Sequence, residues 1–346
     1  MKVLLGWELG AGQGHIQRLA TLAKALQVNG CEPIFALKAY HFRNLQFPWQ
    51  IIEPPALFFS GREDSYAYPD ILETFGFADP ILLSTHIQSW QTILQAVQPH
   101  LVIADHAPGL VLAAQGHVPT VVVGSHFAVP PPVEIFPPLR LPTPPESLER
   151  QARVGETIRK VLKIERSLGQ LFNGDYSFIF SIPELDCYRF WRVNPHYVGI
   201  HITPVPSHRS QAQGAAWAYL NESHPDYNLV IRTLNAAHDF KPLPAVFRDQ
   251  SLVIHHGGLT TTIGCLLSGM PQLVLPCYLE QELTALALIR LGVAQMMIRP
   301  TWDDLLMLQA QTPIIAQKAK KQAQNLTHWN QNFTNQVVEK CLQLAA

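Results

Sequence analysis

The chain has 346 residues and a mass of 38.7 kDa, enough for two domains of ordinary size. Its net charge is −1, only 15% of its residues are charged, and its one cationic run, Lys318–Lys321, fits a solvated helix face, so we expect no nucleic-acid partner. Five scattered cysteines argue against a disulfide framework or a zinc site, and without a signal-peptide pattern or a long apolar run we expect a cytoplasmic protein with no transmembrane segment.

The N-terminal segment reads as a strand, a glycine-rich loop and a helix. We expect a strand over Lys2–Gly6, a helix with one apolar face that ends at Gly30, and a second strand over Glu32–Leu37. This βαβ start could bind a dinucleotide, but its glycines are spaced GxGxG rather than GxGxxG. In addition, the nearest acid, Glu32, opens the second strand, whereas a ribose-binding acid would close it. A dehydrogenase is therefore the less favoured interpretation.

His15 lies where this loop meets the helix. Gly12 and Gly14 shape the loop near it, and an imidazole at such a position can act as a general base near neutral pH. The chain has 15 histidines, so the residue type alone leaves open a role as a loop filler or a first helical residue.

An acidic residue ends the next clear strand, Leu101–Asp105. Ligands of doubly wound sheets gather at the carboxyl ends of the strands, so Asp105 could accept a hydrogen bond from His15 and fix its tautomer. A capping role for Asp105 on the following helix, Pro108–Gln115, is a competing interpretation. The neighbouring His106 suggests a metal, but His15, Asp105 and His106 lack a compact ligand spacing.

The rest of the first domain is expected to be α/β. The segment 128–146 is proline-dense, which forbids a helix, and Phe127, Phe136 and Leu139 favour a packed loop over a disordered linker. The remaining predicted elements are strands over Trp49–Ile52, Thr120–Gly124 and Ser177–Ile182, and helices over Ile71–Val97 and Glu146–Phe172. The apolar positions of Ile71–Val97 suit a ligand pocket and a plain core equally well.

A polar, proline-rich stretch marks the domain boundary. We expect a first domain over 1–199, a linker over 200–213, a second domain over 214–328 and a terminal segment over 329–346. The second domain begins with a strand at Ala215–Leu220 and one helical stretch near 227–237. Its last elements are a strand over Ala294–Ile298 and helices over Trp302–Gln309 and Thr312–Ala323, and the terminal segment is expected to form a helix over Trp329–Leu344.

The stretch 251–293 carries the clearest pattern. A buried strand, Ser251–His255, leads through a Gly- and Thr-rich turn into a helix at Ile263–Leu267, followed by a strand, Gln272–Pro276, and a helix, Glu280–Leu291. The turn joins backbone N–H groups and a helix dipole to hydroxyl and imidazole groups, which suits a diphosphate. Its polar side chains are His256, Thr260, Thr261 and Thr262. A turn that needs glycine only for its backbone angles is the alternative.

Two segments resemble the UDP-glycosyltransferase superfamily, the GT-B-fold enzymes that glycosylate small molecules. The stretch HHGGLTTTIGCLLSGMPQLVLPCYLEQ looks like the donor-binding motif of that family, with the spacing kept throughout. The matching positions are His256, Gly257, Gly258, Thr261, Gly269, Pro271, Pro276, Glu280 and Gln281. The segment GQGHIQRLATLAKALQVNG is similar to the N-terminal segment that holds the catalytic base of the family, and there the base matches His15.

The resemblance implies a fold and a reaction. The fold would be two doubly wound parallel-sheet domains that face each other across a cleft, with 329–346 crossing back to the first domain. The reaction would be an inverting transfer of a sugar from a UDP or dTDP sugar to a hydroxyl of a small apolar acceptor. His15 would be the base, and Asp105 would orient it. The His256–Thr262 turn would bind the phosphates, and Glu280 and Gln281 the sugar hydroxyls. No metal or other cofactor is expected.

Three departures from the family pattern leave alternatives open. Many members carry a glutamate that binds the ribose where this chain has Gly264, Cys31 replaces a second histidine, and the second domain is shortened. Gly264 and the shortened second domain motivate a non-catalytic, glycosyltransferase-like partner protein as an alternative, whereas Cys31 does not affect the chemistry. A sugar-nucleotide epimerase on the same fold is a second alternative, although it should need more carboxylates around the sugar.

Overall fold

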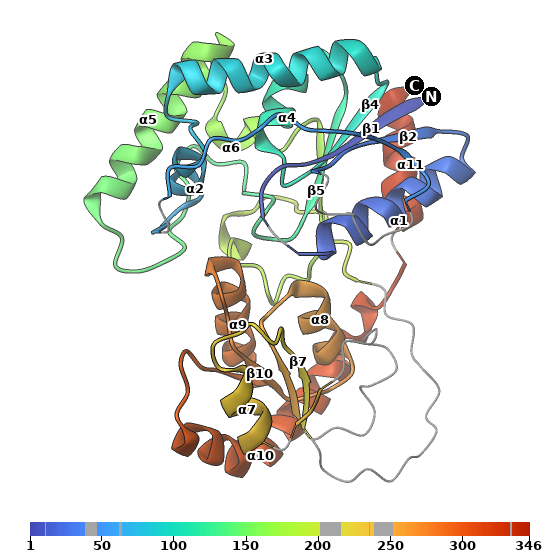
Figure 1. Cartoon of the computed structure of the whole chain (residues 1–346). Coiled ribbons are helices and arrows are strands. Elements are labelled where there is room, and N and C mark those ends of the chain that lie inside the picture. Colours follow the sequence, from blue (N-terminus) through green and yellow to red (C-terminus); the bar gives the residue numbers. More distant parts are fainter. Residues whose placement is uncertain are drawn as a thin grey trace. The chain divides into compact units, whose positions relative to one another are not determined.

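The computed structural model describes residues 1–10, 12–38, 47–61, 64–200, 216–234, 236–238, 252–332 and 334–346. The chain forms two compact units (Figure 1). The N-terminal unit comprises Met1–Phe180, Tyr188–Tyr197 and Phe333–Ala346, and the C-terminal unit comprises Ser181–Cys187 and Val198–Asn332. The predicted linker, 200–213, lies outside the described residues except for residue 200.

The N-terminal unit contains a parallel sheet in the order β3-β2-β1-β4-β5-β6. Every residue of β4 and β5 is buried, as expected for parallel strands that are covered on both faces. The strands are β1 (Lys2–Trp7), β2 (Glu32–Ala36), β3 (Gln50–Ile52), β4 (Leu101–Asp105), β5 (Thr120–Gly124) and β6 (Tyr176–Ile179). All six predicted strands are confirmed, with small shifts at their ends.

The pairing of β1 with β4 places Trp7 beside Asp105, a residue of the predicted site. In this register Trp7 lies opposite Asp105, so both stand where the carboxyl ends of adjacent strands meet. The first helix, α1 (Gly14–Val28), starts beyond the same edge and packs against the last helix, α11 (Thr334–Ala345) (Figure 1). Residues from both ends of the chain therefore build this unit.

Two long predicted helices are each broken in the structure. Ile71–Val97 divides into α2 (Tyr68–Thr74) and α3 (Pro80–Val97), because Gly76 adopts a left-handed φ of 85° and Asp79 caps a new helix from its side chain. Glu146–Phe172 divides into α5 (Pro145–Leu162) and α6 (Leu168–Leu171), because Lys163 turns left-handed at the end of α5. The shorter α4 (Pro108–Ala114) agrees with the prediction.

The proline-rich segment before α5 is a packed loop. Phe127, Phe136 and Leu139 are buried, as the sequence suggested. The backbone N–H of Phe136 donates to Gln151 Oε1 at 2.9 Å, and that of Leu139 donates to the Tyr66 carbonyl at 2.6 Å. The alternative of a disordered linker is therefore wrong.

The C-terminal unit is built on a second parallel sheet in the order β11-β10-β9-β7-β8. Its strands are β7 (Ala216–Tyr219), β8 (Ala237–His238), β9 (Leu252–His255), β10 (Gln272–Val274) and β11 (Ala294–Met296). Its helices are α7 (Tyr227–Thr233), α8 (Leu259–Leu267), α9 (Leu279–Leu291) and α10 (Trp302–Leu326). Ile182 and Leu185, from the segment after β6, belong to the core of this unit.

The helix boundaries of this unit differ from the prediction. The helical stretch expected near 227–237 ends with α7 at Thr233, and Ala237–His238 is strand β8. The sequence predicted a break between Trp302–Gln309 and Thr312–Ala323, but α10 continues through Pro313. Proline removes one backbone hydrogen bond, and the buried apolar face of α10, which includes Leu308 and Ile315, is sufficient to keep the helix together. No helix among the described residues is both long and apolar enough to span a membrane.

Candidate functional site

The structure brings His15 and Asp105 together at the carboxyl edge of the N-terminal sheet. His15 lies in the first turn of α1, and Asp105 is the last residue of β4. His15 Nδ1 lies 2.9 Å from Asp105 Oδ1. Such a carboxylate contact holds the proton on Nδ1 and leaves Nε2 as the basic nitrogen. The geometry is that of a base with its orienting acid.

Arg18 supports Asp105 from the other side. It follows His15 by one turn of α1, and its guanidinium donates to Asp105 Oδ2. Burial of Asp105 raises the pKa of its carboxyl, but the charges of Arg18 and His15 and their hydrogen bonds outweigh burial and leave that pKa below its ordinary value. The fully buried carboxylate therefore stays ionised at neutral pH.

The structure decides against the capping role of Asp105. The residue before α4 is Ala107, and no side chain caps that helix. Both carboxylate oxygens of Asp105 instead bond to residues of α1. Asp105 thus ties the end of β4 to the start of α1.

Trp7 fixes the plane of the His15 ring. The two rings stack with centroids 4.6 Å apart and planes 17° apart. The indole N–H of Trp7 donates to the Leu9 carbonyl at 2.5 Å, which orients the indole. An aromatic face favours a nearby cation, so Trp7 also stabilises a protonated His15. No local sequence pattern marked Trp7 or Arg18 as site residues, because the contacts of Trp7 with His15 and of Arg18 with Asp105 form only when β1, β4 and α1 come together.

The glycines of the loop differ in what they provide. Gly12 has a φ of 99°, which favours glycine, and a Cβ there or at Gly14 would meet no atom within 4 Å.

His106 follows Asp105 with a left-handed φ of 47°, and its ring centroid lies 6.3 Å from that of His15. Within the described ranges, no group of three or more His, Cys, Asp or Glu side chains could hold a metal ion.

A second buried carboxylate follows β1. Glu8 accepts hydrogen bonds from His86 Nε2 at 2.8 Å, from the Gly109 N–H at 2.7 Å and from the Trp90 indole. Gly109 is required there, since a Cβ would stand 2.3 Å from His86 Nε2. Glu8 therefore ties the end of β1 to α3 and α4, and it keeps the edge that carries Trp7 in place.

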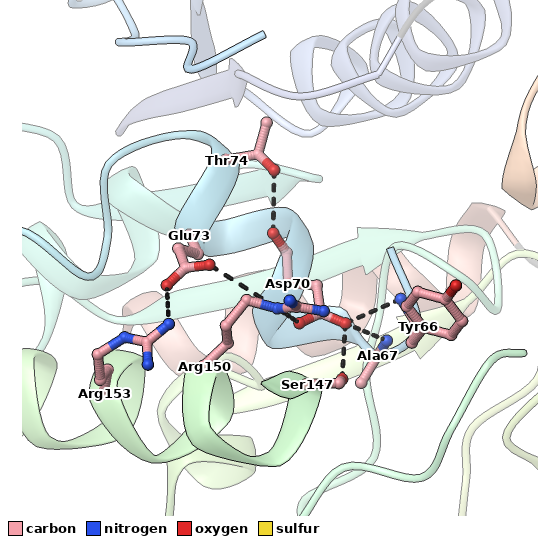
Figure 2. A network of polar contacts seen from close by, with 8 residues as sticks. All are labelled: Tyr66, Ala67, Asp70, Glu73, Thr74, Ser147, Arg150 and Arg153. Carbon is pink, nitrogen blue, oxygen red and sulfur yellow. Dashed lines mark hydrogen bonds and ion pairs between the residues drawn. The ribbon is translucent and has the colours of Figure 1, made fainter. Parts of the chain in front are cut away.

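A buried polar network joins α2 to α5 (Figure 2). Asp70 accepts from the backbone of Tyr66 and Ala67, from the Ser147 hydroxyl and from Arg150 Nε. Figure 2 shows these donors around one carboxylate, with Glu73 and Arg153 forming an outer pair at 2.8 Å. The network fixes how the two helices pack.

In the C-terminal unit, His255 shapes the turn after β9. It is fully buried, accepts from the Gly257 N–H on Nδ1 at 3.0 Å and lies 2.9 Å from Gln272 Oε1 through Nε2. Burial, with the charge of His256, lowers the pKa of His255 to about 3 against the opposing bond to Gln272. His255 is thus a neutral structural residue, whereas the neighbouring His256 is only partly buried.

The turn packs directly on the start of α9. Gly257 has a φ of 92°, and a Cβ there would lie 3.0 Å from Val274 Cγ1 and 3.1 Å from Gln281 Cβ. Gln281 is buried, and its Oε1 accepts from the Cys277 N–H at 2.8 Å, so it braces the turn before α9. The structure therefore places Gly257 and Gln281 side by side, while Glu280 next to them is half-buried.

The threonines lie in the first turn of α8. This helix starts at Leu259, earlier than predicted, with Gly258 preceding it. Thr260 is exposed, whereas Thr261 and Thr262 are buried. The first N–H groups of a helix have no partner within the helix, and the positive end of the α8 dipole lies after Gly258. Only Thr260 presents its side chain at the surface.

His256 lies beside the loop that follows β7. Burial and the charge of His224 lower the pKa of His256, although a hydrogen bond to the Tyr219 backbone opposes the shift. The two histidines therefore lie close enough to interact, although no sequence motif pointed to His224. An anion bound here would favour the protonated form of His256.

Comparisons with known proteins agree with this architecture. No protein-family model matches the chain. A stretch of 88 residues is 34% identical to the elloramycin glycosyltransferase ElmGT of Streptomyces olivaceus, and it covers 25% of this chain and 23% of that protein. The chain thus matches about a quarter of the length of this curated relative.

Solved structures match over nearly the whole chain. The calicheamicin glycosyltransferase CalG4 is 12% identical with a TM-score of 0.69, over 99% of this chain and 98% of that one. The glycosyltransferase VinC, solved in complex with dTDP, is 15% identical with a TM-score of 0.64, over 100% and 99%. The two parallel sheets and these matches show that the chain has the GT-B fold of glycosyltransferases, as the sequence predicted.

Proposed function

We propose that the chain is an inverting glycosyltransferase that moves a sugar from a UDP or dTDP sugar to a hydroxyl of a small apolar acceptor. The observation that carries the proposal is the buried carboxylate–imidazole pair of Asp105 and His15, 2.9 Å apart. The dTDP bound to VinC, which has the same fold, favours a nucleotide diphosphate donor.

His15 would activate the acceptor. The acceptor O–H bond breaks and its proton passes to His15 Nε2, while the oxygen forms a bond to the anomeric carbon. The bond from that carbon to the diphosphate oxygen breaks, and its electron pair leaves with the diphosphate. Asp105 stabilises the imidazolium that forms, and Trp7 stacks on it.

The turn from His256 to Thr262 would receive the leaving diphosphate. The helix N-terminus after Gly258, the imidazole of His256 and the hydroxyl of exposed Thr260 offer fixed donors to the growing charge. Glu280 would bind sugar hydroxyls. Gln281 would have two roles. Its Oε1 already accepts a backbone N–H and so holds the turn in place, and the rest of its amide would bind the sugar. This step would need no metal.

The test compares His15→Ala with His117→Ala, which removes an exposed histidine of the same unit. Transfer from dTDP-glucose and UDP-glucose to a panel of phenols and alcohols would be followed by chromatography, and dTDP and UDP binding by calorimetry. His15→Ala should lose transfer and keep nucleotide affinity, and His117→Ala should keep both. Full transfer by His15→Ala would show that the mechanism is wrong.

A non-catalytic partner protein is the second candidate. Gly264, buried within α8, stands where many family members place a ribose-binding glutamate, and this favours weakened donor binding. That candidate predicts no heat of binding with either nucleotide in the wild type. Binding that is lost in His256→Ala would instead support the transferase.

A further inference from the structure

Gly10 lies against the basic nitrogen of His15. Its φ is 89°, and a Cβ built on it would stand 3.1 Å from His15 Nε2 and 3.4 Å from His106 Nδ1. Since His15 Nδ1 is engaged by Asp105, Nε2 is the nitrogen that must reach a substrate. Any side chain at this exposed position would stand in front of that nitrogen.

His106 faces the same point from the end of β4. It is buried, and its φ of 47° is unusual for a residue with a side chain. The Leu9 N–H donates to its carbonyl at 2.9 Å, which ties this conformation to the loop that holds Gly10. Strained backbone persists where the surrounding structure enforces it, commonly at functional sites.

Two buried aromatic residues lie near the His106 ring. The ring centroid of Phe127 lies 6.1 Å away and that of Tyr68 6.3 Å away. These buried rings fix the imidazole, so its Nδ1 edge stays turned toward Gly10 and His15. One oxygen atom between the two imidazoles can hydrogen-bond to both.

We propose that the reacting hydroxyl of the acceptor binds between His15 Nε2 and His106 Nδ1, against the bare backbone of Gly10. The hydroxyl donates to His15 and accepts from the His106 N–H, so His106 determines where the oxygen is held. The space beside Gly10 limits the acceptor. Sterically unhindered hydroxyls, such as those of phenols and primary alcohols, reach His15 Nε2, and those of tertiary alcohols do not. This inference rests on the transferase activity proposed above.

The first test concerns Gly10. Gly10→Ala should lower acceptor kcat/KM by about 100-fold, because a displacement of about 1 Å from the reacting geometry has that effect. Gly12 has a similar left-handed φ, but a Cβ there would not contact His15 or His106. Gly12→Ala should therefore stay at least about tenfold more active than Gly10→Ala. Gly30→Ala, with a φ of 78° and no atom within 4 Å, controls for backbone strain alone. Melting temperatures verify that each variant folds.

The second test separates contact from strain at His106. Glycine and asparagine both tolerate a left-handed φ, but only asparagine keeps an N–H donor near the place of Nδ1. His106→Gly should raise the acceptor KM by about tenfold with dTDP affinity unchanged, the effect of about one hydrogen bond. His106→Asn should restore KM to within about threefold of the wild type.

The possible outcomes distinguish a wrong acceptor site from a wrong assignment of the transferase activity. The probe is the phenol or alcohol that the wild type glycosylates fastest from dTDP-glucose or UDP-glucose. If Gly10→Ala is as active as Gly12→Ala, or if His106→Gly and His106→Asn have equal KM, the inference is wrong and the transferase stands. If the wild type glycosylates no acceptor and binds no nucleotide, both are overturned.

Discussion

At the scale of single residues, Asp105 is expected to act through charge. Asp105→Asn removes the carboxylate that stabilises protonated His15 and favours the wrong tautomer, so kcat should fall by roughly 10³–10⁴-fold. The dTDP dissociation constant, measured by calorimetry, should not change, because Asp105 lies in the N-terminal unit. A kcat within about twofold of the wild type would exclude a base that depends on this acid.

The Asp70 network offers a matched pair of arginines on one helix. Arg150 is 4% exposed and bonds to Asp70, whereas Arg153, one turn later, is 52% exposed and pairs with Glu73. Removal of one partner from a buried ion pair destabilises by about 3–5 kcal/mol, whereas an exposed pair contributes at most about 1 kcal/mol. Arg150→Ala should therefore lower the urea midpoint far more than Arg153→Ala, and equal midpoints would contradict this assignment.

The sequence indicated His15 and Asp105, the proposed base and acid, but not the residues that hold them. His15 and Asp105 belong to recognisable motifs, each at an element end that could be read locally. Trp7, Arg18 and Glu8 act through partners brought close by the β1–β4 register or by the turn of α1, and no local pattern reports such contacts. In the sequence, Gly10 is visible only as part of a glycine spacing. Its proposed steric role depends on the imidazoles of His15 and His106, which belong to different elements.

At the scale of elements, the turn between β9 and α8 depends on a neutral His255. Its pKa of about 3 lies below the value of 6.5 for an ordinary histidine, so below pH 6.5 the unfolded chain takes up a proton that the folded chain does not. The unfolding free energy should therefore fall as the pH drops from 6.5 toward 3, by at most about 1.4 kcal/mol per pH unit from this group.

His255→Asn tests this pH dependence. Its amide oxygen can still accept from the Gly257 N–H, but the side chain no longer titrates. Urea unfolding between pH 4.5 and 8 should show a shallower acid slope for the variant than for the wild type. Parallel curves would mean that other groups cause the acid loss of stability.

The strands were easier to predict than the helix ends. Buried runs with β-branched residues, such as Leu101–Asp105, can be recognised from the sequence alone, since both faces of a parallel strand need apolar side chains. The break between α2 and α3 and the continuity of α10 through Pro313 depend on capping and packing that outweigh local preference. Boundaries of this kind are set by the tertiary structure.

At the scale of the whole molecule, nucleotide binding should affect the two units unequally. At 100 times its dissociation constant, dTDP stabilises by about 2.7 kcal/mol and should raise the melting temperature by a few degrees. Hydrogen exchange should slow in peptides that cover 252–282 and stay unchanged in peptides that cover 101–106. Slower hydrogen exchange confined to the loop before α1 would mean that the nucleotide binds the N-terminal unit, and the proposed donor site would then be wrong.

The path of the chain has a consequence for its biosynthesis. The helix α11, with Val337, Val338 and Cys341 buried, packs on α1 and completes the N-terminal unit, although the whole C-terminal unit precedes it in the sequence. A ribosome that synthesises this chain therefore releases every strand of the second sheet while the face of α1 is still uncovered. The unit that emerges first from the exit tunnel is the last to be finished.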